Sequence, residues 1–478
     1  MQYLNKEQKG FHIMNRIKVK IKDLLRFLYF SAPGSLRHSS KYKKVYSDTM
    51  RLLNEAEKWD EKQIIDYQNA KISEIVKYAY EYVPYYKRLF DENGINPDLI
   101  KTVNDLNSIP FLTKEIIKRE GDNMRSREYS SKQLVSHLTG GSSGKPVNFW
   151  FEKDVDLAYE DATVDYVYSK FGLTKSDKTV IFGDTSFVRE AERINPNIVC
   201  KKMPGTKRWC FGYTTIENKA KDYLQALQSI KPDWIIACPS HLYRLVSSLK
   251  QHGYLEYGIY TKGIIFKSEM LYPFQEKEIM SFFRTNLFQV YGHTEHLCMA
   301  FSMSPENGYR MVDTYGISQY LEFGGSKYEL IATGIHNRVM PLIRYKTMDL
   351  FTLPCECVER VGAERVITSI DGRSSDVLYL KDGRVVTDIF CDFTTLSTEL
   401  QDDIQQYQIT QSEKGKCILK IVPRDGAFLN QQKIEKIKNI CDETFFYQMD
   451  VSIEIVDSIP RTGRGKEKLI ISSIPINE

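Results

Sequence analysis

Three short apolar runs decide the class of fold: Trp234-Ile235-Ile236-Ala237, Gly263-Ile264-Ile265-Phe266 and Leu287-Phe288-Gln289-Val290. Helical patterns at 240–250 and 273–284 separate them. Strands that alternate with helices of this length indicate a layered α/β domain, in which helices cover a sheet.

The residues before this stretch have a helical pattern. Apolar side chains recur at three- and four-residue spacing between Lys62 and Phe90. Val83-Pro84 predicts an interruption there, because proline lacks a backbone donor. Helices are therefore expected to dominate from about residue 45 to residue 120.

The pattern changes again after residue 372. Two β-runs, at 407–411 and 416–422, flank Glu413-Lys414-Gly415, which predicts a hairpin; a helical run at 430–442 and a β-run at 450–456 follow. These elements predict a small α+β domain at 372–478, separate from a large domain at 1–371.

Composition excludes several classes of protein. The chain has 478 residues and is therefore far too long for a disulfide-stapled mini-protein. Because 42% of its residues are hydrophobic, it can bury a sizeable core. Lys and Arg number 66 and Asp and Glu number 62, which gives a net charge of +4. This near balance argues against a dedicated nucleic-acid binder.

Cysteine use and apolar runs bear on the compartment. The nine cysteines are odd in number and scattered, and no signal peptide precedes them, which predicts reduced thiols in the cytoplasm. No uninterrupted apolar stretch approaches the roughly 20 residues that a spanning helix needs. Residues 9–30 mix basic with bulky apolar side chains. They are expected either to pack on the protein itself, which the sequence favours, or to lie on the anionic inner face of the membrane.

A glycine- and serine-rich stretch runs from Thr139 to Pro146 (TGGSSGKP). Glycines allow close backbone approach, and N–H and hydroxyl groups can bind phosphate oxygens. The stretch is not a Walker loop, which would require Gly at 139 and Ser or Thr at 146. Taken alone, such a stretch is more often a flexible turn, but three later motifs favour the phosphate site.

Those motifs follow in order along the chain. Tyr291-Gly292-His293-Thr294-Glu295 comes after a strand-like run, where α/β sheets place ligands, and Glu295 is either a ligand of nucleotide-bound Mg²⁺ or a solvated carboxylate. Arg344-Tyr345-Lys346-Thr347-Met348-Asp349 offers a carboxylate for ribose hydroxyls or a surface ion pair. Pro460-Arg461-Thr462-Gly463-Arg464-Gly465-Lys466 predicts a basic loop whose lysine suits developing negative charge.

Together these motifs resemble the adenylate-forming superfamily of acyl-CoA ligases, in particular its phenylacetate–CoA ligase-like branch and the CapK-type proteins of surface-polysaccharide biosynthesis. The resemblance covers nearly the whole chain. It includes Val83-Pro84-Tyr85-Tyr86, Ile109-Pro110-Phe111-Leu112-Thr113-Lys114, Pro239-Ser240-His241-Leu242 and Gly372-Arg373-Ser374-Ser375-Asp376. It implies an α/β fold with a large multi-layer N-terminal domain and a small mobile C-terminal α+β domain.

The resemblance also implies roles for individual residues. The implied ATP-phosphate ligands are Thr139, Gly140, Gly141, Ser142, Ser143 and Gly144. Adenine would lie against Lys267, Ser268 and Glu269, and the nucleotide would also meet Tyr291, Gly292 and Thr294. Glu295 would associate with Mg²⁺ through ATP, and Asp349 and Arg373 would approach the ribose. Asp376 is the implied hinge. Lys466 is the implied catalytic lysine, and its spacing from Pro460 favours it over Lys468.

Two departures from that family stand out. Met348 occupies a position that is often glycine before the ribose aspartate, and Gly140-Gly141 replaces a more usual Ser-Gly. Relatives often carry a small zinc site; Cys355-Glu356-Cys357 is present here and His296 and Cys298 could substitute for other ligands. No four-ligand set is evident, so the sequence favours reduced cysteines over structural zinc.

Three histidines fall within motifs: His137, His241 and His293. The resemblance puts them near the substrate side, while a lone loop histidine is more often a structural hydrogen-bonding residue. None is assigned as a general base, because activation of an ionised carboxylate needs none.

The resemblance therefore implies an ATP- and Mg²⁺-dependent ligase that activates a small carboxylic acid as an acyl-adenylate. The acceptor stays open between a thiol, such as CoA, and an amine, which could be sugar-linked. A phenylacetate-type aryl-acid–CoA ligase and a non-catalytic scaffold that retains the fold are the alternatives. The sequence does not reveal which acid is activated.

Overall fold

The structure is a computed structural model that describes residues 38–138, 147–183, 199–203, 205–212, 216–304, 307–324, 327–354, 360–361, 364–373, 377–386, 403–424, 427–445, 447–460 and 469–474. The segment 9–30, the phosphate-loop residues 139–144, Cys355, Cys357, the hinge candidate Asp376, and Lys466 with its rival Lys468 lie outside the described residues.

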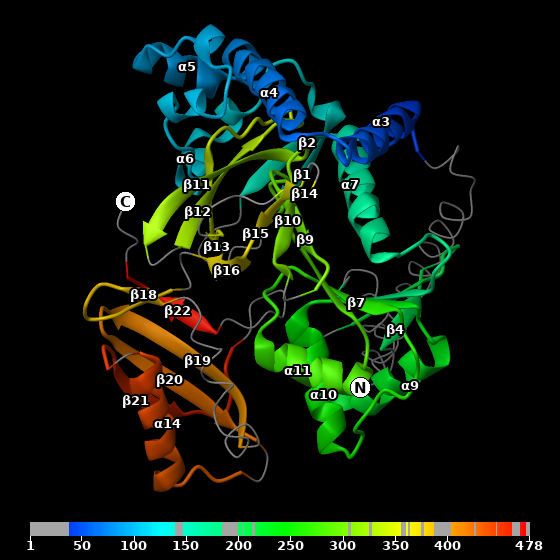
Figure 1. The fold of residues 1–478 in the computed structure, drawn as a ribbon, viewed down its shortest axis with the longest axis vertical. Coiled ribbons are helices and arrows are strands. Elements are labelled where there is room, and N and C mark those ends of the chain that lie inside the picture. Colours follow the sequence, from blue (N-terminus) through cyan, green and yellow to red (C-terminus); the bar gives the residue numbers. More distant parts are fainter. Residues whose placement is uncertain are drawn as a thin grey trace, which may run out of the picture.

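Helices form the first part of the chain: α3 (Ser40–Ala56), α4 (Glu61–Tyr82), α5 (Pro84–Asn93) and α6 (Lys114–Glu120). Asp60 and Gln63 form a capping box at the start of α4. Pro84 starts α5 directly after the break at Val83, as the sequence predicts, because proline is tolerated in the first helical turn. α4 and α5 lie at one end of the molecule (Figure 1).

A hairpin and a long helix follow. β1 (Leu134–Leu138) pairs antiparallel with β2 (Asn148–Glu152), and α7 (Val155–Phe171) comes next. α3 packs on α7, where Tyr42 donates a hydrogen bond to Asp161 at 2.7 Å and Tyr46 donates one to Asp165 at 2.6 Å. Carboxylates on α7 therefore tie it to its neighbours, a feature that recurs at the candidate site.

A ten-stranded sheet forms the centre, in the order β14-β15-β10-β9-β8-β7-β6-β3-β5-β4. The strands β5, β3, β6, β7 and β8 run parallel to one another, and β9, β10, β15, β14 and β4 pair antiparallel with their neighbours. Their bounds are β3 Thr179–Phe182, β4 Cys200–Lys202, β5 Arg208–Phe211, β6 Trp234–Ala237, β7 Gly263–Lys267, β8 Leu287–Gly292, β9 Met299–Ser302, β10 Tyr309–Val312, β14 Arg360–Val361 and β15 Glu364–Ile367. The three apolar runs that opened the sequence analysis are thus β6, β7 and β8.

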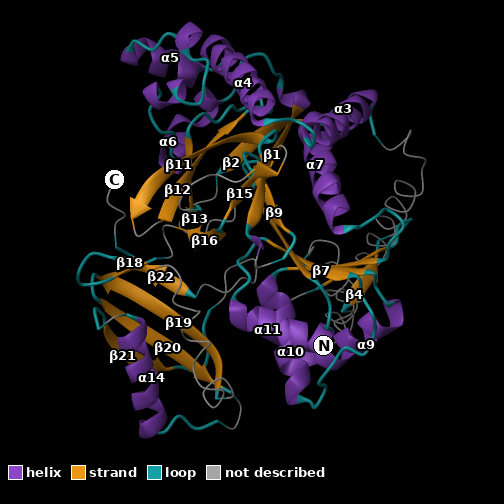
Figure 2. Ribbon diagram, viewed as in Figure 1, coloured by secondary structure: helices purple, strands orange, loops and turns teal. Residues whose placement is uncertain are grey.

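The connecting helices cover one part of this sheet: α9 (Ala220–Ile230), α10 (Pro239–Gln251) and α11 (Pro273–Phe283). Leu242 and Leu245 of α10 are fully buried in one core with Ile264 of β7. Figure 2 shows α10 and α11 side by side beneath β7. The helical runs predicted at 240–250 and 273–284 are confirmed within one residue at each end.

Strands between residues 316 and 373 form a second sheet, in the order β11-β12-β13-β16. Its strands are β11 (Gly316–Gly324), β12 (Lys327–Gly334), β13 (Tyr345–Thr352) and β16 (Ser369–Arg373). Leu112, from the segment before α6, extends this packing through two backbone hydrogen bonds, to the Arg344 carbonyl at 3.0 Å and from the Lys346 amide at 2.9 Å. The motif around Lys114 is thereby fixed beside β13.

The C-terminal part has its own core and a four-stranded sheet in the order β21-β20-β19-β22. Its elements are β17 (Leu378–Tyr379), β18 (Val385–Val386), β19 (Ile404–Glu413), β20 (Lys416–Pro423), α14 (Gln431–Thr444), β21 (Asp450–Ile455) and β22 (Ile470–Ser472). Gly415 makes the predicted hairpin turn with a φ of 74°. No helix of the described residues is long and apolar enough to cross a membrane.

Candidate functional site

The candidate site lies where the parallel strands end. β6, β7 and β8 are neighbours, so their carboxyl ends share one edge of the sheet, the usual ligand edge of an α/β fold. Ser240 follows β6, Glu269 follows β7 and Glu295 follows β8. The backbone amide of Ser240 donates a hydrogen bond to Glu269 at 3.1 Å, which joins the first two of these turns.

Three predicted residues meet in one cluster: Tyr291, Asp349 and Arg373. The Tyr291 hydroxyl donates a hydrogen bond to Asp349 Oδ2 at 2.6 Å, and Arg373 Nε lies 3.3 Å from Asp349 Oδ1. Asp349 of β13 and Arg373 of β16 are directly paired in the sheet register. Burial raises the pKa of Tyr291 well above its usual value, and Asp349 adds to the effect, so the phenol stays a donor.

Glu295 forms a second cluster beside the first. Its Oε1 accepts a hydrogen bond from Tyr345 at 3.2 Å, and its Oε2 lies 3.7 Å from His293 Nδ1. Its side chain is 13% exposed. Asp349 and Arg373 act electrostatically on both Tyr345 and His293, so the two clusters form one site.

The His293 ring is buried and makes no hydrogen bond through either nitrogen in the described structure. Burial lowers the pKa of His293, against the opposing charge of Glu295, so the neutral imidazole dominates near pH 7. A buried polar group without a hydrogen bond requires an explanation. One nitrogen of this ring can donate and the other accept, which suits a polar group of a bound molecule.

The Glu295 carboxylate has the chemistry of a Mg²⁺ ligand. Within the part of the chain that the structure describes, no three or more His, Cys, Asp or Glu side chains are grouped so as to hold a metal. Mg²⁺ characteristically takes one or two carboxylates together with phosphate oxygens and water. A single carboxylate that lies beside the ligand edge and is largely shielded from solvent fits that pattern.

The other residues raised for zinc are engaged elsewhere. Cys298 is buried, its sulfur lies 3.8 Å from Ser318 Oγ, and burial raises the pKa of its thiol to about 12, so it stays protonated. His296 Nδ1 is 2.9 Å from Asp156 Oδ1.

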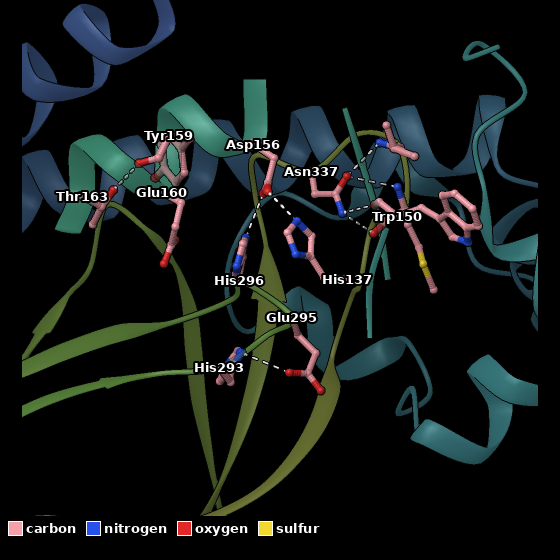
Figure 3. Close-up of polar contacts among 12 residues, drawn as sticks. His137, Trp150, Asp156, Tyr159, Glu160, Thr163, His293, Glu295, His296 and Asn337 are labelled. Carbon is pink, nitrogen blue, oxygen red and sulfur yellow. Dashed lines mark hydrogen bonds and ion pairs between the residues drawn. The ribbon is translucent and has the colours of Figure 1, made fainter. Parts of the chain in front are cut away.

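His137, Asp156 and His296 make up a third group, the imidazole–carboxylate cluster, next to Glu295. Asp156 of α7 lies between the two rings, 2.9 Å from His296 and 3.8 Å from His137 (Figure 3). Phe151 packs on both rings, at centroid distances of 4.9 and 5.1 Å. His137 is the penultimate residue of β1, two residues before the phosphate-loop candidate begins.

Most predicted site residues in the described chain come together, and several others were missed. The site brings together Tyr291, Glu295, Asp349 and Arg373. Ser268 and Glu269 lie beyond the end of the adjacent strand, Gly292 is the last residue of β8, and Thr294 belongs to the turn that carries Glu295. Tyr345 and Asp156 were not assigned a role. Lys114 was quoted in a motif but was not assigned a role either. Burial lowers its pKa, and its charge interacts with those of Glu295 and Arg373.

Solved structures identify the class of fold. 2-Hydroxyisobutyryl-CoA ligase in the postadenylation state matches with a TM-score of 0.63 over 85% of this chain and 88% of that chain, at 14% identity. The same enzyme in an open conformation matches with a TM-score of 0.51, at 15% identity, over 84% of this chain and 90% of that chain. The chain thus has the fold of the adenylate-forming CoA ligases, with a large N-terminal and a C-terminal domain.

Relatives by sequence give the particular branch. Protein CapK of Staphylococcus aureus is 23% identical over 448 residues, which is 94% of this chain and 96% of that protein. Phenylacetate-coenzyme A ligase of Escherichia coli (strain K12) is 25% identical over 357 residues, 67% of this chain and 73% of that enzyme. Residues 378–473 match the family described as the CapK C-terminal domain. The chain is a homologue of CapK and of the phenylacetate-coenzyme A ligases, and these ligases and its structural neighbours are adenylate-forming enzymes.

Proposed function

We propose that this protein is an ATP-dependent ligase that activates a carboxylic acid as an acyl-adenylate and passes the acyl group to a thiol or an amine. One observation carries the proposal: the Tyr291–Asp349–Arg373 cluster and the Tyr345–Glu295 pair lie together at the carboxyl end of the parallel strands. A carboxylate held by two donors suits ribose hydroxyls, and a second carboxylate nearby suits the cation of a nucleotide.

The reaction brings two anions together. The acid's carboxylate oxygen attacks the α-phosphorus of ATP; a new oxygen–phosphorus bond forms and the bond to pyrophosphate breaks. When bound, Mg²⁺ would neutralise part of the negative charge of the phosphates. In the proposed assignment Asp349 orients the ribose, Arg373 holds Asp349, and Glu295 faces the phosphates. Catalysis of this kind depends on positioning and electrostatics more than on proton transfer.

Residues outside the described part of the chain enter the proposal from sequence alone. Thr139 to Gly144 would bind phosphate oxygens, and Lys466 would meet the developing charge at the acid and the α-phosphate. The proposed domains are 1–371 and 372–478, with Asp376 as hinge. The separate core of the C-terminal elements supports this division, and a small domain able to move would gate the site between half-reactions.

Context and acceptor belong to the same proposal. The likeness to CapK over nearly the whole chain favours surface-polysaccharide biosynthesis, and that to phenylacetate-coenzyme A ligases favours a CoA acceptor. A cytoplasmic location completes the proposal. Residues 9–30 either pack on the protein itself, which the sequence favours, or lie on the inner face of the membrane; their deletion would lower sedimentation with anionic liposomes only in the second case.

The test is acid-dependent ATP–pyrophosphate exchange with a panel of aryl, fatty, amino and hexuronic acids, followed by product analysis with CoA or with amines. Lys466→Ala should reduce exchange sharply, whereas Lys468→Ala, the matched control in the same loop, should retain most of it. If the wild-type protein gave no exchange with any acid, the scaffold alternative would replace this proposal.

A further inference from the structure

Backbone conformations that L-residues avoid are concentrated at the candidate site. Eight non-glycine residues of the described chain have φ between 50° and 69°. Four of them lie in or beside the site: Ser268, His296, Arg344 and Met348. Such residues persist only where the surrounding structure holds them, and they gather at functional sites. Each of these four residues therefore needs a contact that holds its conformation.

His296 has the clearest answer. It ends the tight turn that carries Glu295: its amide donates to the His293 carbonyl at 3.1 Å, and its φ is 53°. The turn belongs to the loop 293–298, which β8 and β9 close through the pair Gly292–Met299. Inside this loop no ladder bonds fix the backbone. The placement of Glu295 therefore depends on the conformation of its neighbour His296 as well as on the hydrogen bond from Tyr345.

A carboxylate on a different element fixes that neighbour. Asp156, in the first turn of α7, contacts His296 Nδ1 at 2.9 Å, and the His296 and Asp156 side chains are 17% and 13% exposed. Figure 3 shows Asp156 descending from the helix between His137 and His296, with Glu295 on the far side of the turn. The far end of the loop packs closely on β11. The backbones of Leu297 and Gly316 approach so closely that a Cβ at Gly316 would lie 1.8 Å from the Leu297 carbonyl oxygen.

We propose that Asp156 is a positioning residue that holds Glu295 in place through the left-handed His296. The inference rests on the proposed function of Glu295 and adds to its support a residue that lies 140 positions from His296 in sequence. Glu160, one helical turn along α7, also acts on His296 electrostatically, but its carboxylate accepts a hydrogen bond from the Tyr315 hydroxyl at 2.5 Å. His137 is a weaker contact of Asp156, at 3.8 Å.

The experiment tests whether a second substitution restores the activity that Asp156→Ala loses. Asp156→Ala should lower kcat/KM for MgATP in acid-dependent exchange by about tenfold, and Asp156→Asn, which keeps an acceptor oxygen, should lower it less. Glycine adopts φ near 53° without strain. The double variant Asp156→Ala/His296→Gly should therefore recover most of the loss and approach His296→Gly alone. Asp161→Ala is the matched control, because that carboxylate also lies on α7 and holds Tyr42 instead.

A second readout needs no ligand. Hydrogen–deuterium exchange of a peptide covering 293–298 should be faster in Asp156→Ala than in the wild type or in Asp161→Ala. A double variant as impaired as Asp156→Ala, or unchanged exchange in that peptide, would overturn the inference. If the wild type gave no pyrophosphate exchange, the proposed function would fail by itself, and the peptide exchange would still decide whether Asp156 fixes the turn.

Discussion

The two acidic residues of the site are held in contrasting ways. Glu295 precedes a left-handed residue, His296, in a loop between β8 and β9, and Asp349 follows one, Met348, inside the sheet. His296 is anchored through its own side chain by Asp156. Met348 sits in an irregularity of β13, between β12 and β16, where Thr347 Oγ1 donates to the Leu330 carbonyl at 2.8 Å and accepts from the Asp349 amide at 3.1 Å.

The difference follows from where backbone hydrogen bonds are available. A strand flanked on both sides can hold an irregular residue with ladder bonds and a nearby hydroxyl group. A loop has no ladder, so a side-chain contact from a separate element has to restrain it. The Glu295 turn should therefore be sensitive to a distant residue, and the Asp349 turn to its strand neighbours.

The largest expected effect separates the two carboxylates by role. Glu295→Gln should reduce kcat of acid-dependent exchange about 100-fold, equivalent to about 2.7 kcal/mol, because it removes the carboxylate that would hold the nucleotide-bound Mg²⁺. Glu92→Gln, an exposed carboxylate on α5, is the control and should be silent. Steady-state exchange at varied MgATP measures it; a change of less than threefold would remove Glu295 from the site.

The next effect should appear in KM. Asp349→Asn is expected to raise KM for ATP about tenfold, roughly 1.4 kcal/mol, since one charged acceptor for ribose hydroxyls is lost. The wild type should discriminate against 2′,3′-dideoxy-ATP, and the variant should discriminate less. Equal discrimination by both proteins would mean that Asp349 does not contact the ribose.

The same substitution at both turns should give different stabilities. Met348→Gly relieves a left-handed φ of 65° and should change the free energy of unfolding by less than about 0.5 kcal/mol, because lost side-chain contacts and chain entropy offset the relief. His296→Gly also removes the contact with Asp156 and should cost about 1–2 kcal/mol. Urea unfolding of both variants tests this; equal values would mean that the Asp156 contact adds no stability.

The smallest expected effect is on the pH dependence of stability, and it concerns Glu329, which contacts the Met348 backbone. Burial raises the pKa of Glu329 on β12, against the opposing effects of Lys346, 3.5 Å away, and of a hydrogen bond with the Met348 backbone. The native state thus binds the Glu329 proton more tightly than the unfolded chain, and stability is lost as pH rises from about 4.5 through the raised pKa. The stability of Glu329→Gln relative to the wild type should therefore increase over that range and level off above it. A flat pH profile of the difference would contradict the shift.

The order of elements was predictable because it is written in local patterns. The apolar runs at β6, β7 and β8, the proline at the start of α5 and the glycine of the β19–β20 hairpin each act within a few residues. The motifs that carry Glu295 and Asp349 were equally readable, since each is a short segment next to a strand.

The partners of those residues were not predictable, because they come from elsewhere in the chain. Tyr345 reaches Glu295 across 50 residues and Asp156 reaches His296 across 140. A lone tyrosine or aspartate on a strand or helix gives no local signal of such a contact. Lys114 was visible in a motif, but its proximity to Glu295 depends on the packing of Leu112 beside β13.

The sequence by itself determined the alternation of strands and helices, the small C-terminal α+β unit and the acidic residues at strand ends, because hydrophobic period and turn chemistry are local properties. Only the tertiary structure decided which side chains restrain those acids. Left-handed conformations at His296 and Met348 are unfavourable in an isolated peptide. They exist here because α7, β12 and β16, brought together by burial of the core, supply the contacts that hold them.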